Sequence, residues 1–323
     1  AAGGKAGAGH LVLNFDEDLL ALFAEVRCWE KFAGEFAIPY AAHDLCNQRE
    51  KLRVARQHVL RVVRAYNGIL DALAPDERRL FADHLRRLDK RVNQGINKLL
   101  WTGKGIVEYY VRDCVAACGE VAGAVARFHR ARALVAKGCR AVAALVLLKI
   151  DKSATYDDKM FADRQAAHQE AIKARLEAHH RTLKGHVQDM YEHFKEGSGS
   201  VRNEWRNLVA ALDKSVEQAL RHCVKKSLQE LSRAINGDTK VDPQTLFKIN
   251  IVLDNNRVDF RPTMINLTHA VNVAAKELIA AVRAVPRLRG ALAEDDRRRA
   301  LQAQQAQEGS DSPRGEGGGG GGG

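Results

Sequence analysis

The sequence predicts an all-α fold of elongated, consecutive helical bundles, with one small β-hairpin near the C-terminal end. Three observations carry this expectation. Apolar residues recur at spacings of three and four over long stretches, which is the pattern of amphipathic helices. No proline occurs between Pro75 and Pro243, so no proline ring interrupts a helix there. Residues 246–260, by contrast, show the alternate spacing that is typical of strands.

The first half of the chain is expected to form four helices. Asp16 can cap the first of them, and Pro75 suits the first position of the third. A turn near Gly34 and Pro39 separates the first helix from the second, which would be on the order of 50 Å long. Residues 102–105 are expected to form a loop ahead of the fourth helix. The apolar spacing places the four helices over residues 16–29, 40–74, 75–101 and 106–148.

Two long helices are expected to follow. The first carries a seam of inward-facing residues spaced alternately four and three apart, which is typical of coiled coils. Ser200 can cap the second helix after a break over residues 196–200, and Gly237 can end it. The seam consists of Leu176, His180, Leu183, Val187, Met190 and Phe194.

A β-hairpin and one more helix complete the predicted fold. Residues 246–253 and 257–260 have the composition of two strands, joined by a turn over 254–256. Pro262 then opens a helix that ends before Pro286. The predicted division is a disordered leader, a first helical bundle, a long helical hairpin, a β-hairpin plus helix, and a disordered Gln- and Gly-rich tail, over residues 1–10, 11–151, 152–240, 241–289 and 290–323.

The chain is basic, with a formal net charge of +11 and a pI near 9.5. Basic and acidic residues balance from residue 287 onward, so the excess positive charge belongs to the helical part. This excess favours an acidic partner, and it leaves open whether that partner is protein, nucleic acid or membrane surface.

The composition favours a soluble intracellular protein. No secretory signal is apparent at the N-terminus. The longest apolar run, residues 141–148, is shorter than the roughly 18–20 residues that span a bilayer. Scattered cysteines are expected to be buried thiols rather than a disulfide framework. They are Cys28, Cys46, Cys114, Cys118, Cys139 and Cys223.

No motif predicts a catalytic, cofactor-binding or metal site, so no residue is assigned to any of these roles and no cofactor is expected. Residues 102–105 contain a Gly-Lys pair, but Lys98 and Gly105 stand where a P-loop has its first glycine and its Ser or Thr. Cys114 and Cys118 share a helix face without a second pair of zinc ligands nearby. The simpler interpretation is that both cysteines face the core.

Two patterns have a functional interpretation beside a structural one. His179, His186 and His193 recur every seven residues, which fits a stripe along a helix–helix contact or a pH-sensitive interface. Two basic clusters fit solvated helix faces or a nucleic-acid surface, although no nucleic-acid-binding motif accompanies them. The clusters are Arg78, Arg79, Arg86, Arg87, Lys90 and Arg91, and Arg127, Arg130, Arg132, Lys137 and Arg140.

Several stretches of the sequence carry a resemblance to a known family: residues 13–16, 25–31, 66–70, 88–90, 100–102, 246–254, 258–262 and 285–288. They resemble the N-terminal tail (stem) region of dynein heavy chains, in the family's order over residues 11–289. The hairpin residues are closer to axonemal than to cytoplasmic members. The chain departs from the family after Leu288 and lacks an initiator Met, which suggests a fragment or a truncated or mispredicted gene product.

The resemblance implies a non-catalytic tail segment that acts as an assembly scaffold in microtubule-based movement. It implies binding of dynein intermediate, light intermediate and light chains, and association with another heavy chain, at the cytoskeleton of a ciliary or flagellar axoneme. It also implies that the ATPase ring lies downstream, outside this chain, so no enzyme activity and no membrane partner are expected. The alternative is a basic helical adaptor that binds nucleic acid or another acidic surface. An enzyme whose site is assembled across helices ranks third.

Overall fold

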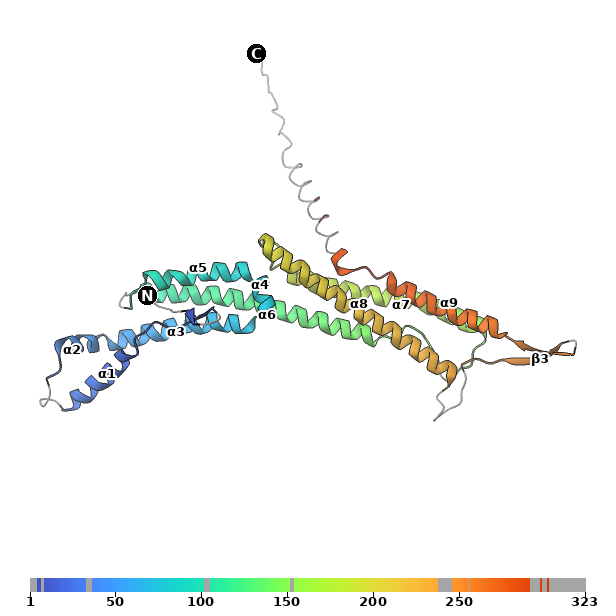
Figure 1. The fold of residues 1–323 in the computed structure, drawn as a ribbon, viewed down its shortest axis with the longest axis horizontal. Coiled ribbons are helices and arrows are strands. Elements are labelled where there is room, and N and C mark those ends of the chain that lie inside the picture. Colours follow the sequence, from blue (N-terminus) through green and yellow to red (C-terminus); the bar gives the residue numbers. More distant parts are fainter. Residues whose placement is uncertain are drawn as a thin grey trace, which may run out of the picture. The chain divides into compact units, whose positions relative to one another are not determined.

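The computed structural model describes residues 5–6, 9–32, 37–101, 105–151, 154–237, 246–254, 256–290, 297 and 301. Helices dominate, and the predicted all-α class with one small hairpin near the C-terminal end is confirmed. Figure 1 traces the elements along the chain. In order they are β1 (Lys5–Ala6), β2 (His10–Leu11), α1 (Asp18–Trp29), the 3-10 helix η2 (Glu30–Phe32), α2 (Tyr40–Asn47), α3 (Arg49–Ala72), α4 (Pro75–Leu80), α5 (Ala82–Lys98), α6 (Ile106–Ala144), α7 (Asp158–Tyr191), α8 (Gly199–Asn236), β3 (Asn250–Asp254), β4 (Arg257–Arg261) and α9 (Met264–Arg283).

The chain forms two compact units. The first comprises residues 1–130 and 191–205, and the second comprises residues 131–190 and 206–323. Helices α6, α7 and α8 contribute residues to both units, so the unit boundaries lie within or at the ends of helices. The division into five segments made from the sequence stays a prediction. Most of its leader and nearly all of its tail lie outside the described residues.

Three phenylalanine rings form the centre of the first unit. Phe81, Phe128 and Phe194 are at most 1% exposed, and their ring centroids lie 5.0 to 5.9 Å apart in edge-to-face pairs. Such pairs add to the burial of the rings. Phe81 also explains why the predicted helix over 75–101 is wrong. The backbone at Phe81 (ψ 10°) turns the chain between α4 and α5, which places its ring in this core.

The predicted helix over 40–74 is likewise two helices. Gln48 has a ψ of −5°, away from the helical value, and separates α2 from α3. At the end of the next predicted helix, α5 stops at Lys98 because Leu99 is extended, so Trp101 lies beyond it. Pro39 directly precedes α2, as the turn prediction requires, whereas Gly34 and residues 102–104 lie outside the described residues.

Local signals predicted some of the helix ends. Pro75 is the first residue of α4, as predicted. Asp16 lies one residue before Glu17, which directly precedes α1, although its carboxylate still accepts the backbone N–H of Asp18 at 3.0 Å. Gly237, with a φ of +71°, directly follows α8. The prediction for Ser200 is wrong, because α8 already begins one residue earlier and this serine lies inside it. The last helix does not begin at Pro262, as predicted, but two residues later, at Met264.

The core of the second unit gathers side chains from α7, α8, α9 and the segment that follows α6. The predicted seam faces inward over its first five residues, from Leu176 to Met190, which are all buried on α7. Its sixth residue, Phe194, is also buried but lies beyond the end of α7 at Tyr191, in the core of the first unit. Gly138 of α6 allows a close approach to α7, because a Cβ there would lie 2.6 Å from Leu183. The buried cluster comprises Leu145, Leu147, Leu148, Tyr156, Phe161, Ile172, Leu176, Cys223, Leu231, Leu246, Ala270, Ala274 and Leu278.

The predicted continuation of the fourth helix to residue 148 is wrong, since α6 ends at Ala144. Polar side chains take the backbone groups of the segment that follows. The Ser227 hydroxyl accepts the N–H of Leu147 at 2.9 Å. The Gln165 amide accepts the N–H of Lys149 at 3.3 Å and donates to its carbonyl at 2.9 Å. These bonds replace those of a helix, so the backbone groups of this segment find partners without regular secondary structure.

The hairpin predicted near the C-terminal end is present but shorter. Strand β3 begins at Asn250 rather than at 246, because the chain before it pairs elsewhere. The carbonyl of Leu246 accepts the N–H of Tyr156 at 2.9 Å, and Phe247 forms a parallel bridge with the same tyrosine. Within the predicted turn, Asn255 lies outside the described residues.

Candidate partner-binding surfaces

Sequence stretches far apart in the chain meet at α3 in the first unit. The Asn67 amide accepts the N–H of Leu11 at 2.8 Å and donates to its carbonyl at 2.9 Å. The adjacent Tyr66 donates to Asp89 of α5 at 2.5 Å. Tyr66, Asn67 and Asp89 belong to the stretches that the sequence singled out, and Leu11 lies two residues before another of them. These bonds fix the strand β2 and helix α5 against α3.

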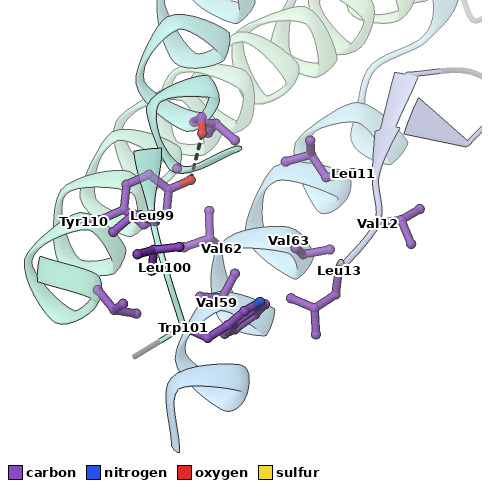
Figure 2. Close-up of a pocket in the computed structure, with 13 residues that line it drawn as sticks. Leu11, Val12, Leu13, Val59, Val62, Val63, Leu99, Leu100, Trp101 and Tyr110 are labelled. Carbon is purple, nitrogen blue, oxygen red and sulfur yellow. Dashed lines mark hydrogen bonds between the residues drawn. The ribbon is translucent and has the colours of Figure 1, made fainter. Parts of the chain in front are cut away.

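An apolar groove, which we call the N-terminal groove, lies beside these contacts (Figure 2). Its cavity volume is about 50 Å³. Small-molecule sites measure roughly 300–1,000 Å³. The cavity can therefore receive one apolar side chain of a partner, and it is too small for a nucleotide or a comparable cofactor. It is lined by Leu11, Val12, Leu13, Val59, Val62, Val63, Val92, Gly95, Leu99, Leu100, Trp101, Val107 and Tyr110.

Aromatic residues hold the walls of the N-terminal groove. Trp101 packs edge-on against Phe15, with ring centroids 5.1 Å apart. Tyr110 of α6 donates to the carbonyl of Val92 at 2.8 Å, which Figure 2 shows as a dashed line. The ring of Tyr110 occupies the space beside Gly95, where a Cβ would lie 2.2 Å from it. Only glycine fits at that position, so α5 and α6 can approach closely.

The hairpin exposes a second apolar surface. Ile251 lies opposite Phe260 and Leu253 lies opposite Val258 in the strand register, so all four share one face. Their exposed fractions are 71%, 52%, 72% and 60% respectively. We call this surface the hairpin face. A two-stranded hairpin on its own is marginally stable in water, and exposed apolar faces mark interaction sites.

Cys114 and Cys118 lie in the core of the first unit, as the simpler interpretation predicted, with exposed fractions of 0% and 1%. Burial raises the pKa of both thiols, that of Cys118 to about 11, so they stay protonated and unreactive at neutral pH. Among the described residues, no group of three or more His, Cys, Asp or Glu could hold a metal ion.

The predicted histidine stripe is half-buried at each of its positions, His179, His186 and His193. Burial lowers the pKa of His193, and the charge of Arg127 lowers it further, while Glu192 opposes the shift. His186 lies 3.9 Å from the Asp189 carboxylate. The pH-sensitive interface stays a prediction.

Intramolecular bonds engage several cations of the first basic cluster. Arg78 donates to the carbonyls of Leu70 and Leu73, at 2.8 and 3.2 Å, and so satisfies the end of α3. Arg86 pairs with Asp83 at 2.8 Å. These contacts favour a structural and solvated helix face over a nucleic-acid surface, for which long unpaired cations would be needed. The nucleic-acid alternative stays a prediction.

Comparison with known proteins agrees with these features. The family model described as "Dynein heavy chain, N-terminal region 1" matches residues 4–109, which contain the whole lining of the N-terminal groove except Tyr110. The flagellar inner arm I1 dynein-1-beta heavy chain of Chlamydomonas reinhardtii is 38% identical over 91% of the chain. The human and mouse dynein axonemal heavy chain 2 are 33% and 34% identical, each over 85% of it.

The fold and the matched sequence thus define a mainly helical segment of a microtubule-motor heavy chain. The chain belongs to the dynein heavy-chain family and corresponds to the N-terminal tail region of its members. It spans about 6% of the length of each of these three relatives. The matches lie in the tail region and not in the motor domain. Within the described residues, no helix combines the length and apolar character needed to cross a membrane.

Proposed function

We propose that this chain is a non-catalytic assembly scaffold of an axonemal dynein tail. In that role it binds intermediate, light intermediate and light chains, associates with another heavy chain, and contributes to microtubule-based movement in a cilium or flagellum. The observation that carries the proposal is the 38% identity to a flagellar inner-arm heavy chain over 91% of this chain. The names of the human and mouse relatives are axonemal as well.

The surfaces of the chain support a scaffold better than an enzyme. The N-terminal groove and the hairpin face are apolar, and burial of apolar area supplies most of the affinity between proteins. The excess of positive charge suits orientation of acidic partners. Cavities of this kind offer side-chain anchoring rather than a set of convergent catalytic groups.

A reconstitution experiment tests the proposal. The full chain is mixed in turn with purified axonemal dynein intermediate, light intermediate and light chains, and complex formation is measured by analytical ultracentrifugation at low and high salt. We expect a complex that persists at high salt, because apolar burial is not screened by ions. We also expect no ATP turnover above that of a buffer control. Absence of any complex with intermediate, light intermediate or light chains would contradict the scaffold role, and reproducible ATP turnover would contradict its non-catalytic part.

A further inference from the structure

A large open groove runs between α8 and the α9 segment in the second unit. Its volume is about 870 Å³, which far exceeds that of the N-terminal groove. We call it the α8–α9 groove. Its floor is a stripe of aliphatic side chains that are only half-buried, so each still faces solvent on one side. The stripe consists of Leu220, Val224, Leu228, Ile279, Val282 and Val285.

Cations stand on both rims of this floor. Arg221 and Lys225 lie one helical turn apart on α8, and Arg283 and Arg287 lie on the opposite side. Glu217 shows how an acid fits between the rims, since its carboxylate accepts bonds from Arg221 at 2.6 Å and Arg287 at 3.0 Å. In the part of the chain that the structure describes, no acid pairs with Lys225 or Arg283.

The wall formed after α9 is held in place. The Asp213 carboxylate accepts the N–H of Leu288 at 2.7 Å and that of Arg289 at 3.1 Å. Leu288 itself is fully buried. The backbone beside the groove is therefore fixed to α8 by two charge-assisted bonds. A partner would meet a preformed groove, and ordering of this wall would cost it little affinity.

We propose that the α8–α9 groove binds an acidic amphipathic helix of a partner protein. The inference rests on the proposed function, for which it names a surface and the chemistry of the partner. Along α8, the apolar part of the groove extends from Val216 to Leu228, or about 18 Å at about 1.5 Å per residue. A partner helix of about twelve residues would cover it, with apolar residues at i, i+4 and i+8 and acids on both flanks. The aliphatic floor disfavours nucleic acid, which binds through cations and aromatic stacking.

Synthetic helical peptides provide the first test. One peptide carries Leu at every fourth position with Glu on the flanks, a second replaces each Glu by Lys, and a third has the scrambled sequence of the first. Binding of each labelled peptide to the full chain is measured by fluorescence anisotropy. We expect the Glu peptide to bind at least about tenfold more tightly than either of the others. Equal binding of the Glu and scrambled peptides would overturn the inference, because then charge alone attracts them.

Charge reversal locates the site. The variant K225E/R283E should weaken binding of the Glu peptide at least about tenfold and should favour the Lys peptide instead. The control K214E/K276E makes the same charge change on exposed positions of α8 and α9 outside the groove and should change affinity less than about twofold. Equal losses in both variants would overturn the inference. So would displacement of the Glu peptide by a DNA oligonucleotide, or a groove occupied by a second copy of the chain, seen as dimers that K225E/R283E dissociates.

The same variants separate this inference from the proposed function. If the chain binds intermediate chain but no variant or wild-type form prefers the Glu peptide, the groove inference fails while the scaffold role stands. If the Glu peptide binds and responds to K225E/R283E while no dynein subunit binds, the groove inference stands and the scaffold role fails.

Discussion

The phenol of Tyr66 donates a hydrogen bond of 2.5 Å to the Asp89 carboxylate and thereby joins α3 to α5. Burial raises the pKa of Tyr66 well above its ordinary value, and the bond to Asp89 raises it further. The hydroxyl consequently stays a donor at physiological pH. Bonds to charged groups contribute more than neutral ones, so this contact is a main connection between the two helices.

Replacing Tyr66 by Phe should lower the free energy of unfolding by about 1–3 kcal/mol, since Asp89 loses the donor of a charged hydrogen bond. The measurement is urea unfolding followed by circular dichroism. Tyr40→Phe serves as the control, because Tyr40 is 86% exposed and its loss of a hydroxyl should change stability by less than about 0.5 kcal/mol. Indistinguishable midpoints for the two variants would contradict the role of the bond.

The sequence did not predict this bond. Tyr66 and Asp89 both lie in stretches that resemble the family, yet local periodicity says nothing about which side chains meet across two helices. The break at Phe81 was hidden for the same reason, because an apolar residue there fits a continuous helical pattern. Tertiary packing of its ring decides the local backbone.

The sequence analysis did not single out the polar side chains in the core of the second unit, although helical spacing could have identified them. Ser227 stands three residues after Val224 and four before Leu231, so it occupies an inward position of α8. A serine on the inward face of a helix indicates that its hydroxyl forms a hydrogen bond with a buried backbone group. Gln165 has the same role on α7. The surfaces proposed to bind partners were not predicted residue by residue, because they depend on which apolar residues the core leaves uncovered.

The contact between Gly95 and Tyr110 predicts opposite signs for two similar substitutions. Gly95→Ala should destabilise the chain by about 1–3 kcal/mol, because its Cβ would overlap the Tyr110 ring. Gly119→Ala, in α6, meets nothing within 4 Å and should instead stabilise by up to about 1 kcal/mol through the better helix propensity of alanine. Thermal and urea unfolding of both variants give the signs, and stabilisation by Gly95→Ala would refute the close approach.

The hairpin face should govern self-association rather than folding. Replacing Ile251 and Phe260 by Thr removes exposed apolar area, so binding of an apolar dye and concentration-dependent association should fall, while the free energy of unfolding changes by less than about 0.5 kcal/mol. Met160→Thr, at an isolated exposed position on α7, is the control and should leave both readouts unchanged. A large loss of stability in the double variant would show that the face is part of the core.

Stability should fall as pH drops below the ordinary pKa of histidine. Burial lowers the pKa of His84, with Arg87 and His193 lowering it further and Asp83 opposing. A group whose pKa is lowered on folding binds fewer protons in the folded state. Its contribution is therefore complete above about pH 6.5 and is lost as pH falls through that value toward the folded-state pKa.

Replacing His84 by Gln, which does not titrate, should make the loss of stability between about pH 7 and about pH 5.5 smaller. Unfolding in urea at a series of pH values measures this slope. His222→Gln, at an exposed position of α8, is the matched control and should keep the slope of the unaltered chain. An unchanged slope in His84→Gln would assign the pH dependence to other buried histidines, such as His180, whose pKa burial also lowers.

Ser227 and Ser215 form a natural pair for testing the segment after α6. Each donates to the carbonyl four residues earlier in α8, at 2.9 and 3.0 Å, but only Ser227 also accepts the N–H of Leu147. Ser227→Ala leaves that buried N–H without its partner and should cost about 1–3 kcal/mol, whereas Ser215→Ala should be neutral or slightly stabilising. Hydrogen exchange supplies a local readout, because the amide of Leu147 should lose protection selectively in Ser227→Ala. Retained protection there would mean that the segment after α6 is held by its apolar side chains alone.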